Sequence, residues 1–292
     1  MPLYFNKRRH WPPSRPIQFI LAFLALLLAV VILVAWLMIG YHQSAPKPEQ
    51  EPDTSSTTQQ ETITDIGRCL VILDVEEKQH FILVQTNPAT PQVSIMHIPQ
   101  NLAVENSTLK EVFKKHGSPR AVQVVSEALQ LPVSHYLTLN AKGIENFVNQ
   151  FENGIVYTLP EEISYTDEND IRIHLDAKEH TLTGGQVKEI LRYDGWSKST
   201  YRDKIAPELL CALINQYMRE EFPLRAYFGL LSNDAVSDLR IDNFNAYHTA
   251  LTQIARGNNG DVCKISKLTG NTSNGKFAPD IADLQKNSPF YR

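Results

Sequence analysis

The residues of this sequence that could do chemistry do not form a familiar catalytic motif. The sequence contains no P-loop, no G-x-S-x-G nucleophile elbow, no H-E-x-x-H zinc motif and no C-x-x-C pair. Residues 167–170 (DEND) are acidic like a calcium loop, but they lack its glycine and terminal glutamate, which favours a solvated turn. The nine histidines show no metal-ligand spacing. The sequence therefore predicts no metal centre of its own.

Three cysteines are the remaining reactive groups. Cys69, Cys211 and Cys263 all lie in apolar runs that favour strands or a helix. Buried thiols are the simplest interpretation, and a single disulfide between Cys211 and Cys263 is an alternative in an oxidising compartment.

Net charge argues against nucleic-acid binding. The chain of 292 residues has 28 basic and 32 acidic side chains and a formal charge of −4. Residues 1–15 contain four basic residues and no acidic one, so the rest of the chain is more acidic than the average suggests. A body of that charge is unsuited to sequence-independent binding of nucleic acid.

The first part of the chain is predicted to anchor it in a membrane. Residues 17–40 are almost wholly apolar, with Gln18 as the one strongly polar side chain, and as a helix they would extend about 36 Å. This run is too long for a cleaved signal peptide. Because the basic residues precede it, the positive-inside rule places residues 1–16 in the cytoplasm and everything after residue 40 outside.

The anchor is followed by a predicted tether and one folded domain. Residues 41–66 are rich in proline, serine, threonine and glutamine and cannot bury enough apolar surface to fold. Residues 67–292 are expected to form an α/β domain, specifically a three-layer α/β/α sandwich with a mixed central sheet. Three consecutive antiparallel strands are predicted at residues 69–73, 81–84 and 93–98. Further strands are predicted at residues 136–139, 155–159, 171–175 and 262–265.

Helices are predicted by apolar spacing and by capping residues. Ser118 and Pro119 are expected to begin one helix, and others are predicted at residues 144–151, 185–191 and 206–221. Asp242 is expected to cap a last helix that ends at Gly257.

Several stretches, in order, resemble the LytR–CpsA–Psr family. Residues 82–88 (ILVQTNP) and 93–99 (VSIMHIP) are similar to the family's LVSINP and VSVLSIPRD hairpin. Residues 121–140 resemble its helix and following strand, residues 182–193 its LNGEQAL and VRYR passage, and residues 201–213 its GRIERQQ helix. Weaker likeness at 234–244 and 279–284 extends the resemblance over residues 67–285.

The resemblance implies a bacterial cell-envelope enzyme. Members of this family transfer a polyprenyl-pyrophosphate-linked glycopolymer to peptidoglycan. They use arginines against the pyrophosphate, carboxylates on Mg²⁺ and an apolar groove for the prenyl tail. By position in these motifs, Arg192 and Arg202 are the candidate phosphate-binding residues. The alternatives are a surface arginine at position 192 and an Arg202 that pairs with Asp203.

The departures from the family pattern weaken that implication. The family's arginine and aspartate after the second hairpin strand are Gln100 and Asn101 here, and its second VRYR arginine is Asp194. Gln79 replaces an arginine, and Ile205 replaces another. Asp74 could be a displaced metal ligand or a turn carboxylate, and Lys198 could replace a lost arginine. The sequence therefore predicts a weak enzyme or none, with no catalytic residue assigned.

Two functions remain for a single-pass membrane protein with an extracytoplasmic domain. The first is a catalytically degenerate relative, without a cofactor, that binds polyprenyl-linked intermediates or a partner. The alternative is an active Mg²⁺-dependent phosphotransferase that attaches wall teichoic acid or capsule to peptidoglycan. Regulation of transcription, the activity suggested by the family's older name, is the least favoured function, because a stub of residues 1–16 cannot form a DNA-binding fold. We expect an apolar groove with a neutral mouth to favour the first function, and convergent arginines with a carboxylate to favour the second.

Overall fold

The computed structural model describes residues 67–87, 92–166, 172–218, 234–240, 252–254, 256 and 261–291. The predicted cytoplasmic stub, anchor and tether (residues 1–16, 17–40 and 41–66) lie outside these residues, so their boundaries stay predictions. Within the described part, no helix is long and apolar enough to cross a membrane.

A six-stranded mixed sheet forms the centre of the domain. The strands lie in the order β11-β6-β1-β2-β3-β12. Strands β1, β2 and β3 form the predicted antiparallel meander. Strand β6 pairs parallel with β1, β12 pairs parallel with β3, and β11 pairs antiparallel with β6. Their bounds are β1 Gly67–Val75, β2 Lys78–Asn87, β3 Gln92–Ile98, β6 His135–Asn140, β11 Ala235–Ser237 and β12 Cys263–Ser266.

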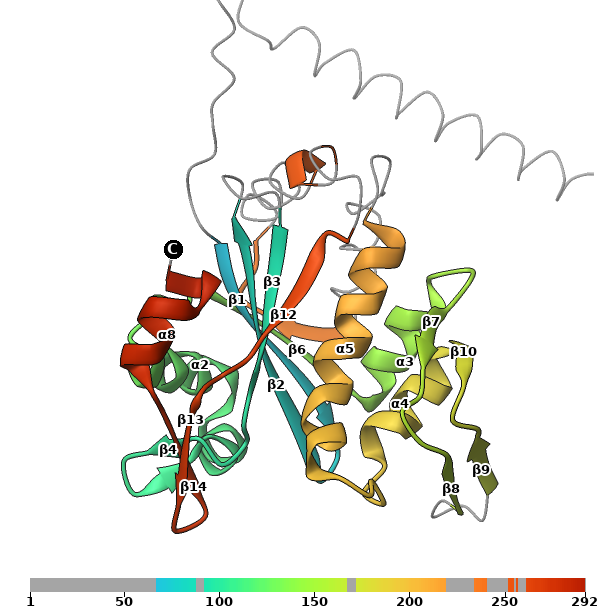
Figure 1. Cartoon of the computed structure of the whole chain (residues 1–292), viewed down its shortest axis with the longest axis horizontal. Helices are drawn as coiled ribbons and strands as arrows, with labels where there is room; N and C mark the ends of the chain where they lie inside the picture. The colour runs from blue at the N-terminus through green and yellow to red at the C-terminus, as the bar shows by residue number, and fades with distance from the viewer. Residues whose placement is uncertain are drawn as a thin grey trace, which may run out of the picture. The chain divides into compact units, whose positions relative to one another are not determined.

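Strand alternation sends apolar side chains to both faces of the sheet. Leu70 and Ile72 of β1 join one buried cluster, whereas Val71 and Val75 join another. Helices α2 and α8 cover the first face, and α3, α4 and α5 cover the second (Figure 1). We call these the packed face and the hollow face. The mixed α/β fold agrees with the prediction from sequence.

On the packed face, the main helix begins earlier than predicted. Helix α2, Leu109–Leu129, is interrupted at Gly117, whose φ of 74° and ψ of −170° are not helical. The expected start at Ser118 and Pro119 is therefore only the second half of the helix. The first half begins at Thr108, which forms a reciprocal capping box with Glu111.

The end of the described chain also packs on this face. Helix α8, Ile281–Asn287, leads into a short 3₁₀ turn, η1, at Pro289–Tyr291. Arg68 donates from Nε to Gln85 Oε1 over 2.7 Å and from Nη2 to the Phe290 carbonyl over 2.8 Å. Gln85 in turn donates to the Pro289 carbonyl over 3.0 Å. A buried guanidinium thus joins the first two strands to the last turn.

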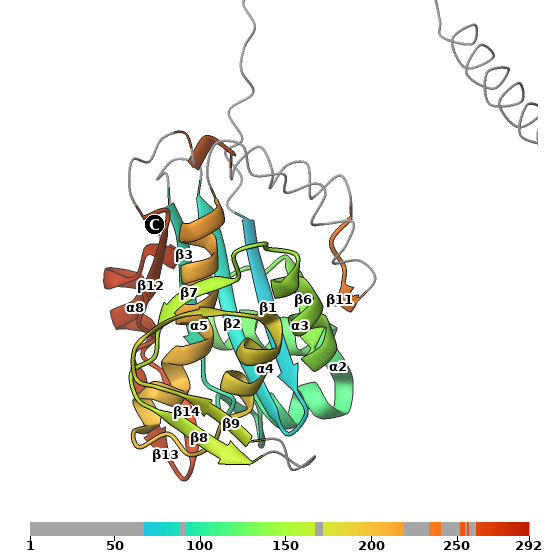
Figure 2. The ribbon, with the colours of Figure 1, turned by 90° about the vertical axis from the view of Figure 1, so that its right-hand side faces the viewer.

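The hollow face carries three helices, α3 Ala141–Asn149, α4 Gly184–Arg192 and α5 Ser199–Tyr217. Figure 2 views the domain from this side, with α4 and α5 in front of the sheet. Helix α5 begins seven residues before the predicted Ala206, so Pro207 lies inside the helix rather than in its first turn. The polar run before Ala206 hid this start, because it has no apolar spacing of its own.

Among the described residues, four strand pairs lie outside the central sheet, contrary to the simple α/β alternation that the sequence suggested. The predicted strands at 155–159 and 171–175 form β7 and β9, which pair antiparallel with β10 and β8 rather than extending the sheet. Their bounds are β7 Ile155–Thr158, β8 Ile163–Thr166, β9 Arg172–Leu175 and β10 Glu179–Leu182. The other two pairs are β4 Ala103–Val104 with β5 Ser107–Thr108, and β13 Gly270–Ser273 with β14 Lys276–Pro279.

The prediction of a last helix ending at Gly257 is wrong in one respect. Most of residues 242–257 lie outside the described part, although 252–254 are helical. Helix α8 follows them in the chain, so it is the later helix. Its N-cap, Asp280, accepts a hydrogen bond from the Asp283 amide over 3.1 Å, a signal that the short apolar pattern of the helix concealed.

Candidate functional site

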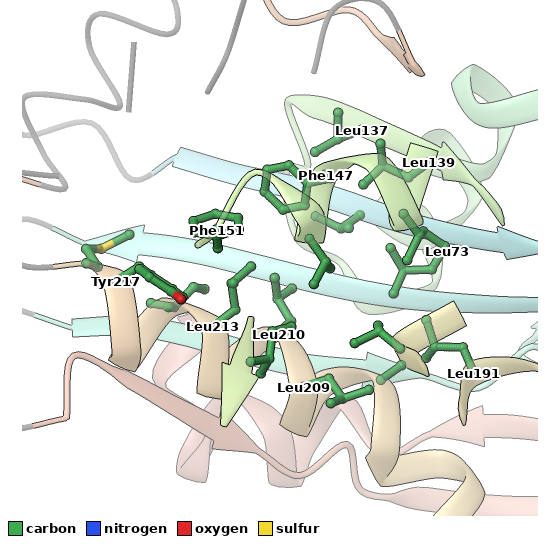
Figure 3. A pocket seen from close by; sticks show the side chains of 18 residues that line it. Leu73, Leu137, Leu139, Phe147, Phe151, Leu191, Leu209, Leu210, Leu213 and Tyr217 are labelled. Atoms are coloured by element: carbon green, nitrogen blue, oxygen red, sulfur yellow. The ribbon is translucent and has the colours of Figure 1, made fainter. Parts of the chain in front are cut away.

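A cavity of about 190 Å³ lies between the sheet and the helices of the hollow face. Its wall is formed by β1 and β6 on one side and by α3, α4 and α5 on the other (Figure 3). Phe151 and Tyr217 lie at one end, and Leu73 and Leu191 lie at the other. The remaining labelled side chains between them are aliphatic or aromatic. Such a surface suits a hydrocarbon chain, and the hydroxyl of Tyr217 is engaged with the Gly154 carbonyl over 2.7 Å.

The family resemblance implied an apolar groove, and helical spacing indicates which side chains face inward, but neither gave the position of this cavity. The apolar spacing of α3 places Ile144, Phe147 and Val148 on its inner face, and α5 contributes Leu209, Leu210, Leu213 and Ile214. Helical periodicity identifies which side chains face inward. It does not tell whether the facing side chains meet or leave a gap.

A cluster of charged residues lies beside the Leu73 and Leu191 end of the cavity. Arg192 is the residue after Leu191, at the end of α4, and its Nη2 lies 2.6 Å from Glu76 Oε2. Glu76 belongs to the tight turn between β1 and β2 and has a φ of 62°. Lys78, the first residue of β2, lies 2.8 Å from Asp194 and also donates to the Arg192 carbonyl. Two cations are therefore each paired with a carboxylate of the same chain.

Lys78 is a site residue that the sequence analysis missed. Burial lowers the pKa of its ammonium group, the Asp194 carboxylate opposes that change, and the charges of Arg202 and Arg192 lower the pKa further. The charges of the two predicted arginines thus both act on one lysine, although they come from α4 and α5. No sequence signal marks Lys78, because its role depends on a turn that brings β2 next to the end of α4.

Arg202 is placed differently from Arg192. It lies in the first turns of α5, is exposed, and makes no ion pair within 4 Å among the described residues. The neighbouring Asp203 has a pKa raised by burial, and the charge of Arg202 opposes that rise. Arg192 follows the cavity residue Leu191, and Arg202 is close enough for its charge to act on Lys78.

A second carboxylate, Glu189, restrains Arg192 from the preceding turn of α4. Glu189 is 8% exposed, lies 3.7 Å from Arg192 Nη1 and accepts from Tyr165 Oη over 2.5 Å. Lys188 lies 3.5 Å from Glu189 and 2.9 Å from Glu145 of α3. Arg192 is therefore held between two carboxylates, Glu76 and Glu189, and approach of an anion would need to displace them.

Two histidines lie near this cluster, on the hollow face of the sheet. The Nε2 of His80 donates a hydrogen bond to the Leu191 carbonyl over 3.0 Å. Burial lowers the pKa of His80 to about 4, and burial also lowers the pKa of His97 to about 4. Both rings are neutral at physiological pH, so neither supplies positive charge to the mouth of the cavity.

The side chains at other positions that depart from the family pattern make contacts within the fold. Gln79 donates to Asp74 Oδ1 over 2.8 Å, which makes Asp74 a turn carboxylate in this structure. Asn101 donates to the Gly275 carbonyl over 2.9 Å, and Ile205 is buried in the core of the hollow face. Lys198 lies over the Tyr201 ring, 5.2 Å from its centroid, instead of facing the arginines.

These residues do not fit a magnesium ion. The ion prefers several hard oxygen ligands, yet Asp74 is bonded to Gln79, and the Asn101 side chain is engaged with Gly275. Within the described ranges, no group of three or more histidine, cysteine, aspartate or glutamate side chains is placed to hold a metal. We therefore assign no step to a metal.

The fold and the cavity define a mixed α/β protein with an apolar internal site, and the sequence places it in a family. The chain belongs to the LytR_cpsA_psr family, whose model matches residues 74–278. A search of curated proteins by sequence found no match.

Solved structures of low sequence identity share the fold. A putative transcription regulator from Eubacterium siraeum aligns with a TM-score of 0.68 at 15% identity, covering 82% of this chain and 97% of that one. TagV of B. subtilis aligns with a TM-score of 0.62 at 19% identity, covering 76% and 94%. The structure of TagT bound to LIIa-WTA aligns with a TM-score of 0.60 at 17% identity, covering 81% and 93%.

Proposed function

We propose that this protein is a membrane-anchored, extracytoplasmic component of the bacterial cell envelope that binds a polyprenyl-linked intermediate without transferring its polymer. The apolar cavity whose cationic mouth is neutralised by the chain's own carboxylates carries this proposal. The anchor and the orientation rest on residues 1–40 of the sequence. Family membership supports a role in cell-wall glycopolymer metabolism.

The mouth of the cavity supports binding over catalysis. A pyrophosphate needs cations that are free to turn toward it, and transfer of a polymer needs extra stabilisation of the charge that develops on the phosphate. Here Lys78 and Arg192 face Asp194 and Glu76, and the exposed Arg202 is the remaining arginine beside the cavity. An ammonium or guanidinium that exchanges one carboxylate for a phosphate gains little net free energy.

One observation favours active transfer as the second candidate. Arg192 and Arg202 come from different helices, yet both act on Lys78 at the same end of the cavity. If the carboxylates swing away when a ligand binds, three cations would surround its phosphates. In that case we would expect transfer of a glycopolymer to peptidoglycan that depends on both arginines.

The test is crosslinking of the full-length protein, in lipid nanodiscs, to a photoreactive short-chain polyprenyl phosphate. Leu210→Trp projects bulk into the cavity, and we expect it to reduce crosslinking at least tenfold. Val236→Trp is the matched control, because Val236 is 63% exposed on β11 and lies away from the cavity wall. Equal crosslinking by the two variants would show that the cavity is not the lipid site.

A parallel assay separates binding from catalysis. The same samples are given a polyprenyl-pyrophosphate-linked glycopolymer and peptidoglycan, with and without Mg²⁺. We expect crosslinking without detectable transfer. Metal-dependent transfer that is lost in Arg192→Gln and Arg202→Gln would replace the binding function with the transferase.

A further inference from the structure

Two buried thiols face each other where α5 meets the edge strand β12. Cys211 of α5 is 8% exposed and Cys263 of β12 is 3% exposed. Both are free thiols, each perturbs the pKa of the other, and the Asn215 side chain contacts both residues. They come from segments far apart in the sequence, which the packing of α5 against β12 brings together.

Asn215 holds the two segments at this spacing. Its Oδ1 accepts from the Cys263 amide over 2.7 Å, and its Nδ2 donates to the Cys263 carbonyl over 3.3 Å. The same amide nitrogen lies 3.8 Å from Cys211 Sγ, one helical turn earlier on the same side of α5. Asn215 thus completes the open edge of β12 as a neighbouring strand would, and it fixes the Cys263 backbone opposite Cys211.

We propose that Cys211 and Cys263 are a disulfide-forming pair that locks α5 to β12 when the domain faces an oxidising environment. The inference rests on the proposed function in one respect, namely the extracytoplasmic position of the domain, where disulfides persist. It does not depend on lipid binding.

Thiol–disulfide exchange gives a balanced route to this bond. The interaction with Cys263 lowers the pKa of Cys211, which favours its thiolate, and the route is written with Cys211 attacking first; the balance is the same if Cys263 attacks first. The Cys211 thiolate attacks one sulfur of a small-molecule or protein disulfide and releases a thiolate. Cys263 then loses its proton, attacks Cys211 Sγ and releases the second thiolate. The protein thiols lose two electrons and two protons, and the external disulfide is reduced to two thiols.

The bond would fix one wall of the cavity. Cys211 lies between Leu210 and Leu213, two residues that line the cavity from α5. A link to β12 closes a loop of roughly 50 residues, and loops of that size lower the entropy of the unfolded chain enough to raise Tm by on the order of 10 °C. The oxidised protein would therefore hold α5, and the cavity wall with it, more firmly than the reduced protein.

The test uses the full-length protein in detergent micelles, equilibrated with graded ratios of reduced and oxidised glutathione. Urea below the unfolding transition is added so that local opening exposes the buried thiols. After an acid quench and alkylation, mass spectrometry of proteolytic peptides reports each cysteine. We expect a crosslinked peptide containing Cys211 and Cys263 at an oxidised-glutathione level at least a hundredfold below that which modifies Cys69. Tm should rise on oxidation.

Matched variants make the result decisive. Cys211→Ser and Cys263→Ser should each abolish the rise in Tm, whereas Cys69→Ser should retain it, because Cys69 lies on β1 and is separated from β12 by two strands. The proposal fails if Cys211 and Cys263 are glutathionylated separately, or if both stay reduced in excess oxidised glutathione. Neither failure would change crosslinking of the polyprenyl phosphate, so the proposed function is tested independently.

Discussion

The two faces of the central sheet carry the same kinds of side chain but differ in how closely those side chains pack. On the packed face, Phe81, Phe290 and Leu129 are fully buried, and the charged group among them, Arg68, is bonded to three carbonyl or amide oxygens. On the hollow face, a cavity of about 190 Å³ separates the sheet from its helices. Protein interiors are normally close-packed, so a cavity of this size gives up dispersion contacts that the other face keeps.

This difference indicates that one face of a sheet can supply stability while the other leaves space for a ligand. The packed face holds the strands in register. The hollow face can then leave apolar surface uncovered without unfolding the domain. A cavity lined by hydrocarbon side chains stays dry and can accept an apolar ligand.

The largest expected effect is a difference between two leucine-to-alanine changes in helices. Leu129→Ala, in α2, should lower the free energy of unfolding by about 3–5 kcal/mol, because it removes a fully packed side chain. Leu213→Ala, in α5, should cost about 1–3 kcal/mol, because one side of that leucine already faces the cavity. Urea unfolding of the two variants measures the difference. Equal losses would mean that the hollow face is packed as tightly as the other.

The second largest expected effect is a fall in the free energy of unfolding at acid pH. His80 and His97 have folded-state pKa values of about 4, against about 6.5 in an unfolded chain. The unfolded chain therefore binds more protons between those values, so stability is complete above about pH 6.5 and falls as the pH drops toward 4. For His80 the loss should reach roughly 2–3 kcal/mol. His80→Gln keeps a donor for the Leu191 carbonyl and should flatten the pH dependence of urea unfolding; an unchanged slope would contradict this.

The smallest expected change in stability comes from the charged mouth of the cavity. Glu76→Gln with Asp194→Asn removes the partners of Arg192 and Lys78, two pairs with exposed carboxylates, and should shift stability by less than about 1 kcal/mol. Binding of inorganic pyrophosphate should nevertheless strengthen roughly tenfold, because both cations lose a competing anion. Calorimetry measures the affinity. Glu77→Gln is the control, since Glu77 pairs with Lys114 of α2, and it should leave binding unchanged.

Local sequence signals predicted the parts of this domain that depend on local structure. The meander of β1, β2 and β3 follows from three β-favouring runs with short polar connections, and the inner face of α5 follows from helical spacing. The start of α2 was missed although Thr108 and Glu111 spell a capping box, because the half-helix they begin has only two buried apolar residues, Leu109 and Val112.

The site was harder to predict because it depends on contacts between distant segments. Arg192 and Arg202 were predicted as phosphate-binding residues by resemblance to family motifs, and in the structure the charges of both act on Lys78. Their partners were not found. Glu76 reaches Arg192 from a turn more than a hundred residues earlier, and Lys78 meets Asp194 in the same way. Charge pairs of this kind leave no periodicity in the sequence, so only the folded chain shows that the cations are already neutralised.

The bond from Arg68 to the Phe290 carbonyl also sets an order on the folding of the chain. The two residues lie 222 positions apart, so a chain synthesised from its N-terminus makes the guanidinium long before its acceptor. During synthesis, β1 can pair with β2, but the core around Arg68 stays open until η1 is available to cover it. Closing so long a loop is slow compared with local pairing. The contacts of Arg68 on the packed face can therefore be completed only after η1 has been synthesised.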